Sequence, residues 1–236
     1  MAEILSAPGP ASGVQVLAYD QAVAELRAVI TDWGGVMTNP IAESVNAWLE
    51  ADGIDRASYV TVMREWVRQA YADGQDRNPI HALERGECSN AEFESELASR
   101  LVLADGGPVA GAGLLTRMFA GSVIDEAMLD LFRTLHASGV PTGLLSNSWG
   151  SEYPRHMFAD LFDAVVISAE VGMRKPEPQI FVHAAELLGI APQECIFIDD
   201  IEANIIAAEQ VGFTGVLHHQ AKGTGELLAN LLGISL

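Results

Sequence analysis

Three carboxylates of this chain stand where predicted buried strands end. Asp32 ends the apolar segment 27–32, and the adjacent pair Asp199 and Asp200 ends the segment 194–200. Neighbouring carboxylates repel one another unless a positive group binds between them. A hard cation with oxygen ligands is the simplest such group, and Mg²⁺ is the usual choice where phosphate is also handled. These residues therefore form a candidate Mg²⁺ site.

Other polar residues would complete a site for a phosphoryl group. Ser146 and Asn147 end another predicted strand, and Lys175 lies in a loop that Pro176 and Pro178 make stiff. A lysine is a compact point charge that can contact a phosphoryl group and a carboxylate at once. Alone, an Asp or Ser at such a position would be read as a helix N-cap. Their convergence on one spot is what favours a functional site.

The elements that must position these residues alternate between strand and helix after residue 124. Alternation of this kind predicts right-handed crossovers and a doubly wound, Rossmann-like parallel sheet covered on both faces, an α/β fold. The carboxyl ends of parallel strands share one edge, and ligands bind in the crevice there. The predicted strands are 27–32, 140–148, 163–168, 194–200 and 214–218.

Between residues 40 and 120 the pattern changes to helices. Ser89 stands three residues before Glu92, the spacing of a capping box at a helix start. The aromatic residues and methionines of this region recur at helical spacing, which indicates the core of a helical bundle. We expect three parts, which are an N-terminal extension (1–25), an α/β core (26–39 and 121–236) and an inserted α-helical unit (40–120).

The composition limits the possible partners. The chain of 236 residues has 32 acidic and 13 basic side chains, a formal net charge of −19. This sign disfavours nucleic acids and anionic membranes, which attract clustered basic residues. The sequence has neither an apolar run long enough to span a membrane nor a visible secretory signal, so we expect a cytoplasmic protein. Cys88 and Cys195 are expected to be reduced thiols. The sequence does not predict the oligomeric state.

Four motifs, in this order, resemble those of the haloacid dehalogenase (HAD) superfamily. The resemblance is to its phosphatase-like branch with a helical C1 cap, and in particular to the N-terminal phosphatase domain of soluble epoxide hydrolases. It covers roughly residues 27–218, and the cap segment 83–97 is also similar. The motifs are DWGGV (32–36), LLSNS (144–148), GMRKPEP (172–178) and FIDDIEANIIAAEQVG (197–212).

The resemblance implies a role for each motif residue. Asp32 would be the nucleophile that attacks phosphorus to give an aspartyl-phosphate, and Lys175 would neutralise charge on Asp32 and the phosphoryl group. Asp199 would bind the metal directly or through water. The full set of Mg²⁺ ligands would be Asp32, Asp199, Asp200 and the backbone carbonyl of Gly34. The groups around the phosphoryl oxygens would be Ser146, Asn147 and Gly35, with Asn204 as a nearby polar support.

Gly34 departs from the family pattern. Active phosphatases of the family usually have an aspartate there, which protonates the leaving oxygen and later activates water, a contribution of about 10²–10⁴ in rate. His81 or His156 could substitute for it. We expect a Mg²⁺-dependent phosphatase acting on a small phosphorylated metabolite. The alternatives are a 2-haloacid dehalogenase, in which the same Asp32 attacks carbon without a metal, and a non-catalytic binding protein.

Overall fold

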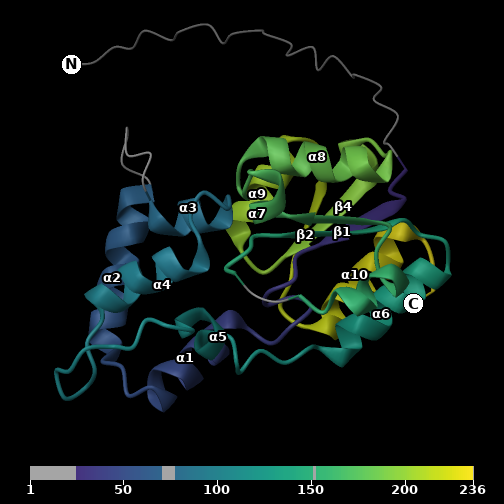
Figure 1. The fold of residues 1–236 in the computed structure, drawn as a ribbon. Coiled ribbons are helices and arrows are strands. Elements are labelled where there is room, and N and C mark those ends of the chain that lie inside the picture. The colour runs from purple at the N-terminus through teal and green to yellow at the C-terminus, as the bar shows by residue number, and fades with distance from the viewer. Residues whose placement is uncertain (1–24, 71–77, 151–152, 236) are drawn as a thin grey trace, which may run out of the picture.

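The structure is a computed structural model that describes residues 25–70, 78–150 and 153–235. The expected N-terminal extension lies outside the described residues, except for residue 25. The part of the chain that the structure describes contains a parallel sheet with helices on both faces and a separate group of helices beside it (Figure 1). This arrangement confirms the predicted α/β fold.

The sheet has five parallel strands in the order β3-β2-β1-β4-β5. From β1 the chain proceeds outward to β2 and β3, and then returns to the other side of β1 for β4 and β5. The carboxyl end of β1 is therefore the point where the strand order reverses, and such points form ligand-binding crevices in open α/β sheets. The strands are β1 (Ala28–Thr31), β2 (Thr142–Ser146), β3 (Ala164–Ile167), β4 (Cys195–Asp199) and β5 (Thr214–Leu217).

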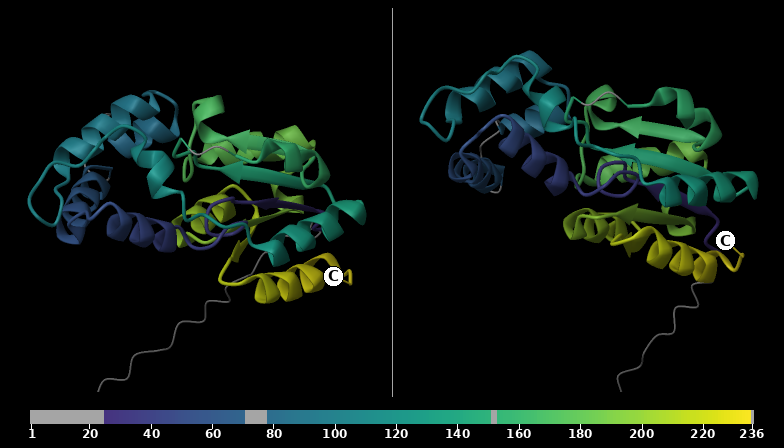
Figure 2. Two further views of the ribbon diagram at one scale, coloured as in Figure 1. Left: turned by 60° about the horizontal axis from the view of Figure 1, so that its bottom comes forward. Right: turned by 90° about the horizontal axis from the view of Figure 1, so that it is seen from below.

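Both faces of the sheet are buried, which explains why its strands are continuous apolar runs. Because side chains alternate along a strand, Ile196 and Ile198 join the core under α6 and α10, whereas Cys195 and Phe197 join the core under α8 and α9 (Figure 2). The helices that cover the sheet are α6 (Glu126–Ala137), α8 (Pro178–Leu188), α9 (Glu202–Gln210) and α10 (Ala221–Leu232). The shorter elements are the 3₁₀ segments Arg155–Asp160 and Pro192–Glu194 and helix α7 (Ser168–Val171).

The remaining helices pack around a hydrophobic cluster of their own, which includes Trp48, Trp66 and Phe93. The predicted capping box is confirmed, since Ser89 and Glu92 each bond the other's backbone N–H at the start of α4. We propose that these helices form the inserted unit of residues 40–120, and we call it the cap. Its helices are α1 (Ile41–Ala51), α2 (Arg56–Ala70), α3 (Pro79–Glu84), α4 (Asn90–Arg100) and α5 (Leu114–Met118).

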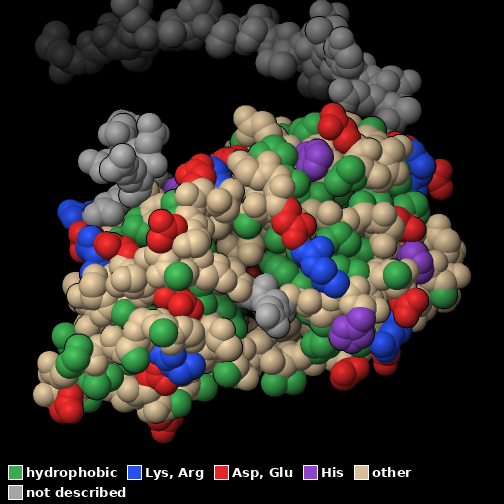
Figure 3. Space-filling view, viewed as in Figure 1, with side chains coloured by type: hydrophobic (Ala, Val, Ile, Leu, Met, Phe, Trp, Pro, Cys, Tyr) green, Lys and Arg blue, Asp and Glu red, His purple; other side chains and the backbone are tan. Residues whose placement is uncertain are grey.

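The molecular surface carries the acidic excess of the sequence. On the face shown in Figure 3, lysine and arginine side chains stand among acidic ones and do not gather into a basic patch. No helix in the described ranges combines the length and the apolar character that a membrane crossing requires.

Candidate active site

The sheet brings the predicted acidic residues together. Asp32 directly follows β1 and its backbone N–H donates to the carbonyl of Ile198 at 2.8 Å, so it lies beside the end of β4. Asp32 and Asp199 are buried, with 7% and 0% of their surface exposed. One carboxylate oxygen from each of Asp32, Asp199 and Asp200 lies within 4.8 Å of the others. The predicted convergence of these acids is thus observed.

Lys175 lies inside this acidic cluster. Its side chain is 1% exposed, and its Nζ is 2.9 Å from Oδ1 of Asp32 and 2.6 Å from Oδ2 of Asp199. Burial lowers the pKa of Lys175, but the two carboxylates outweigh burial and raise its pKa above the ordinary value. The lysine is therefore protonated, and it joins the loop after β1 to the end of β4.

Asn204 fixes the carboxylate of Asp199. Its Nδ2 donates to both oxygens of that carboxylate at 3.1 Å, and the backbone N–H of Ile201 donates to Oδ1 at 2.8 Å. Asn204 lies in the first turn of α9, so the strand β4 and the helix that follows it hold Asp199 between them. Asn204, which the sequence analysis placed near the site as a polar support, thus donates hydrogen bonds directly to Asp199.

The cluster contains more negative than positive charge. Burial, and next the charge of Asp199, raise the pKa of Asp32 to about 7, although Lys175 opposes this rise. Burial and the same neighbour also raise the pKa of Asp200. A cation bound between these carboxylates would favour their ionised forms. The raised pKa values of Asp32 and Asp200 thus fit a site that binds a positive ion.

Two features of Asp200 fit a divalent metal with oxygen ligands. Its Oδ1 is buried and has no hydrogen-bond partner in the described ranges, although such an oxygen normally finds one. Its carboxylate also presses against Gly35, where a Cβ atom would lie only 2.3 Å from Oδ2. Glycine at position 35, with φ of +80°, therefore lets the loop after β1 and Asp200 approach closely. These residues fit Mg²⁺.

Ser146 and Asn147 lie at the same edge, but their side chains have partners that the sequence did not suggest. Ser146 Oγ is 3.0 Å from the hydroxyl of Tyr153, whose pKa burial raises to about 12. Both ends of the Asn147 amide bond to the backbone of Lys175, accepting from its N–H at 2.8 Å and donating to its carbonyl at 3.0 Å. Asn147 thus positions the lysine loop, and phosphoryl binding by these two residues stays a prediction.

Gly34 is covered by hydrocarbon. A Cβ atom at this position would lie 2.9 Å from Cδ1 of Ile41, at the start of α1 in the cap. The backbone of Gly34 is not among those with positive φ, so its conformation does not itself require glycine. An isoleucine thus occupies the space into which an acidic side chain would extend. Metal binding by the Gly34 carbonyl stays a prediction.

The two histidines considered as substitutes for the missing acid do not lie at Gly34. His156 is exposed in the 3₁₀ segment after β2. His81 lies on α3, where burial, Arg174 and Arg85 lower its pKa to about 4. Neither histidine lines the cavity at Gly34. The structure therefore gives no support to either one as a proton donor to the leaving group.

A cavity of about 740 Å³ opens between the core and the cap beside Gly34 and Ser146. Its wall comes largely from the loop after β1, from α1 and α5 of the cap, and from the segment after β2. Uncharged side chains line the whole of its described wall. The cavity is therefore the place where the organic part of a substrate would lie if its phosphoryl group met Asp32.

Ion pairs join α3 of the cap to the loop that carries Lys175. Glu84 is buried and accepts hydrogen bonds from Nε of Arg174 and from the indole N–H of Trp149, the latter at 2.9 Å. Arg85 pairs with Glu177. These contacts fix the cap against the core on the side of α3, and no motif in the sequence indicated them.

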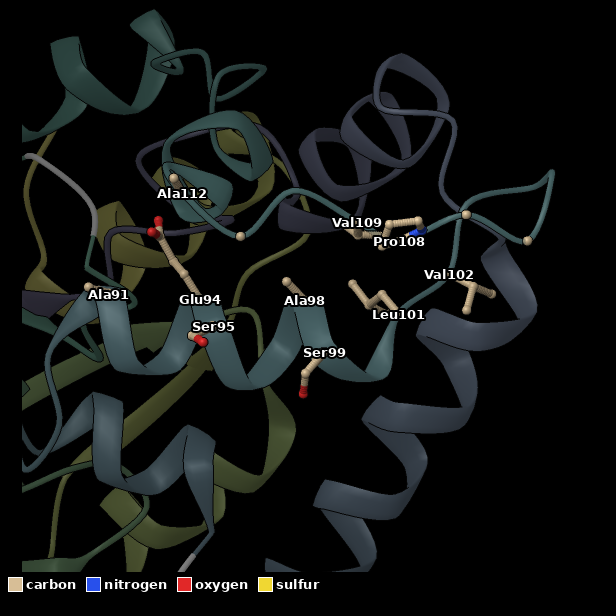
Figure 4. A pocket seen from close by; sticks show the side chains of 13 residues that line it. Ala91, Glu94, Ser95, Ala98, Ser99, Leu101, Val102, Pro108, Val109 and Ala112 are labelled. Carbon is tan, nitrogen blue, oxygen red and sulfur yellow. The ribbon is translucent and has the colours of Figure 1, made fainter.

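A second hollow, of about 730 Å³, lies on the cap along α4 (Figure 4). Mostly small side chains line it. Glu94, the charged residue of its described wall, accepts from the backbone N–H groups of Gly113 and Leu115 at 3.0 and 2.9 Å, and so caps α5. Because this carboxylate is already bonded, the hollow lacks the chemistry of the cluster around Asp32.

Comparisons of the sequence with known proteins all give matches to hydrolases. A family model described as haloacid dehalogenase-like hydrolase matches residues 18–212. A sesquiterpene phosphatase of Aspergillus oryzae is 30% identical over 155 residues, which are 64% of this chain and 77% of the relative. Bifunctional epoxide hydrolase 2 of Mus musculus is 30% identical over 48% of this chain, and the match spans only 22% of that enzyme.

A solved structure shares the fold. An HAD family enzyme of Bacteroides thetaiotaomicron, in complex with magnesium and inorganic phosphate, superposes with a TM-score of 0.59. The match covers 82% of this chain and 94% of that one, at 24% sequence identity. A dehalogenase structure superposes equally well, with a TM-score of 0.59 at 17% identity. At such identities the likeness extends to the fold and not to the reaction.

Proposed function

Because the chain belongs to the haloacid dehalogenase-like hydrolases, we propose that it is a Mg²⁺-dependent phosphatase of a small phosphorylated metabolite. The observation that carries the proposal is the buried cluster of Asp32, Lys175 and Asp199 with the unpartnered oxygen of Asp200 beside it. A purely structural ion pair would have no need of the extra carboxylate. The sesquiterpene phosphatase among the relatives supports the same reaction.

In the proposed reaction Asp32 attacks the phosphorus atom of the substrate. A bond forms between a carboxylate oxygen of Asp32 and phosphorus, the bond from phosphorus to the leaving oxygen breaks, and water later hydrolyses the aspartyl-phosphate to release inorganic phosphate. Lys175 holds Asp32 in place and offsets the negative charge that collects around phosphorus. Catalysis of phosphoryl transfer is mostly positioning and electrostatic stabilisation, which a rigid charged cluster can supply.

Mg²⁺ would be held by the side chains of Asp32 and Asp200, with Asp199 directly or through water. Bound there, it would neutralise the charge of the phosphoryl oxygens. Ser146 would contact a phosphoryl oxygen through its hydroxyl. Gly34 offers no proton, so the leaving oxygen departs as an anion or takes its proton from water.

Two other functions are weaker candidates. A 2-haloacid dehalogenase would need no metal, and the unpartnered Oδ1 of Asp200 would then be a costly feature without purpose. A non-catalytic binding protein has Gly34 in its favour, since the usual acid is missing there. Metal dependence separates the phosphatase from the dehalogenase, and turnover that depends on Asp32 separates both from the binding protein.

The test is hydrolysis of a panel of phosphorylated metabolites, with Mg²⁺ or with EDTA, and of 2-chloropropionate. We expect release of phosphate with Mg²⁺ only, and no release of chloride. Asp32→Asn should lower turnover by on the order of 10⁴-fold or more, since it removes the nucleophile. Asp130→Asn, at an exposed position of α6, is the control and should keep full activity.

Each contrary result has a definite meaning. Turnover that EDTA does not affect would overturn the role of Mg²⁺. Full activity of the Asp32→Asn protein would overturn the covalent mechanism. An inert wild-type protein on the whole panel would favour the binding protein.

A further inference from the structure

The wall of the cavity beside the active site is uncharged throughout its described part, although 19% of the residues of the chain are charged. Several of its side chains are apolar or aromatic, and the others are small polar groups such as Ser44, Thr116 and Ser122. The larger apolar and aromatic side chains of the wall include Trp33, Ile41, Leu115, Phe119, Trp149 and Tyr153.

Four charged side chains where α3 meets the loop of Lys175 are paired with one another. Glu84 receives the indole N–H of Trp149 and pairs with Arg174, and Arg85 pairs with Glu177. These contacts turn the charges of α3 toward the loop of Lys175, and none of these four charged residues lines the cavity. A carboxylate or second phosphate on a substrate would therefore lose water without gaining a charged partner from the described wall, which is costly.

The position of Ile41 leads independently to the same conclusion. Its side chain covers Gly34, where the family usually has an acid, and 40% of its surface is exposed. The atoms next to the leaving oxygen thus meet hydrocarbon and not a proton donor. The loss of the acid and the uncharged wall are consistent with each other, since both leave the organic part of the substrate in uncharged surroundings.

From these two observations we propose that the cavity selects phosphate monoesters whose organic part is uncharged and largely apolar, with Ile41 as a specificity-determining residue. The inference rests on the proposed phosphatase function. Substrates that carry a second charged group, such as phosphorylated acids or nucleotides, are rejected because the wall cannot compensate their charge. An aromatic or aliphatic group, in contrast, gains apolar contact with the wall.

The test compares phenyl phosphate with para-carboxyphenyl phosphate in the presence of Mg²⁺. The para carboxylate changes the basicity of the phenolate leaving group little. The ratio of the two kcat/KM values therefore measures how the cavity accepts the carboxylate, and not a difference in intrinsic reactivity. We expect the carboxylated substrate to react at least about tenfold less well, and 2-naphthyl phosphate to react better than phenyl phosphate. Equal kcat/KM values for phenyl phosphate and its carboxylated analogue would overturn the inference but not the proposed phosphatase function.

A matched pair of variants tests Ile41. Ile41→Lys puts a positive charge into the wall, and the carboxylated ester should then gain about tenfold in kcat/KM relative to phenyl phosphate. Leu187→Lys adds the same charge at an exposed position of α8 outside the cavity and should leave the ratio unchanged. If the two variants have the same ratio, Ile41 does not determine specificity.

Binding separates the inference from the reaction. Calorimetry with Mg²⁺ would compare phenylphosphonate with para-carboxyphenylphosphonate, which cannot be hydrolysed. If the protein shows no turnover but binds phenylphosphonate more tightly than its carboxylated analogue, the result would support the inference and reject the phosphatase. Equal binding of the two, or binding of neither, would reject the inference.

Discussion

The two halves of the candidate site have opposite physical characters. The end at the sheet, formed by Asp32, Lys175, Asp199 and Asp200, is a dense cluster of charges, of which all but Asp200 are buried. The described wall of the cavity under the cap is uncharged and comes from several separate segments. In the proposed phosphatase this difference divides the tasks: the sheet edge would position the reacting groups, and the cap would shape the space for the substrate.

The two halves also differ in how strongly their members depend on one another. In the charged cluster each group needs its partners, because a single buried charge without compensation is very unfavourable. In the cavity each apolar side chain contributes its own contact area, so the effects of substitutions should be more nearly additive. Substitutions in the cluster are therefore expected to be severe, and those in the cavity to be graded.

The largest effect is expected from Lys175→Met, which leaves Asp32 and Asp199 buried without their cation. Removal of one partner of a buried ion pair typically costs about 3–5 kcal/mol in the free energy of unfolding. The measurement is urea denaturation in EDTA. Lys222→Met, whose side chain is 84% exposed, is the control and should change the stability little. Similar midpoints for the two variants would mean that the cluster is not the interdependent unit described above.

The charged half of the site could be predicted from the sequence because it depends on the backbone. Asp32 and Asp199 stand at the ends of apolar strands, and a parallel sheet must bring such ends to one edge. The alternation of strands and helices predicted the parallel sheet, and the acidic cluster followed from the position of these residues at strand ends. The hydrogen bonds of Asn204 to Asp199 agree with its predicted supporting place.

The side-chain contacts around the cavity and between the cap and the core could not be predicted in the same way. The contact of Ile41 with Gly34, the amide of Asn147 on the Lys175 backbone and the pair Glu84–Arg174 each join separate elements or loops. They depend on side-chain directions and on how the cap lies against the core. Neither periodicity nor motif spacing contains that information, so these contacts had to be observed.

A smaller effect is expected from restoring the missing acid. Gly34→Asp places a carboxyl group beside the leaving oxygen, and the backbone of Gly34 does not forbid it, but the new Cβ would lie 2.9 Å from Ile41. The double variant Gly34→Asp with Ile41→Ala removes this clash. We expect it to hydrolyse alkyl phosphates up to about 10²-fold faster than the wild type, with a smaller gain on aryl phosphates.

The two single variants and the double variant, measured side by side, show whether the new acid causes this gain. Gly34→Asp alone should gain less than the double variant, because Ile41 must first move aside. Ile41→Ala alone should gain nothing on alkyl phosphates. If the folded double variant shows no gain on any substrate, the site differs from that of other phosphatases of the family in more than the acid.

The smallest effect concerns the metal, and it tests the charged half directly. A ligand that binds only the folded protein stabilises it by RT ln(1 + [L]/Kd), so Mg²⁺ at ten times its Kd should add about 1.4 kcal/mol to the free energy of unfolding. Asp200→Asn should abolish this response, since it removes the carboxylate whose Oδ1 has no other partner among the described residues. Asp130→Asn, an exposed acid on α6, should keep it. Because Asp200→Asn also relieves repulsion from Asp199, it changes stability in EDTA as well, so the quantity to compare is the shift caused by Mg²⁺. Identical melting of the wild-type protein in Mg²⁺ and in EDTA would show that the cluster holds no metal, and Lys175 would then be its sole counter-ion among the described residues.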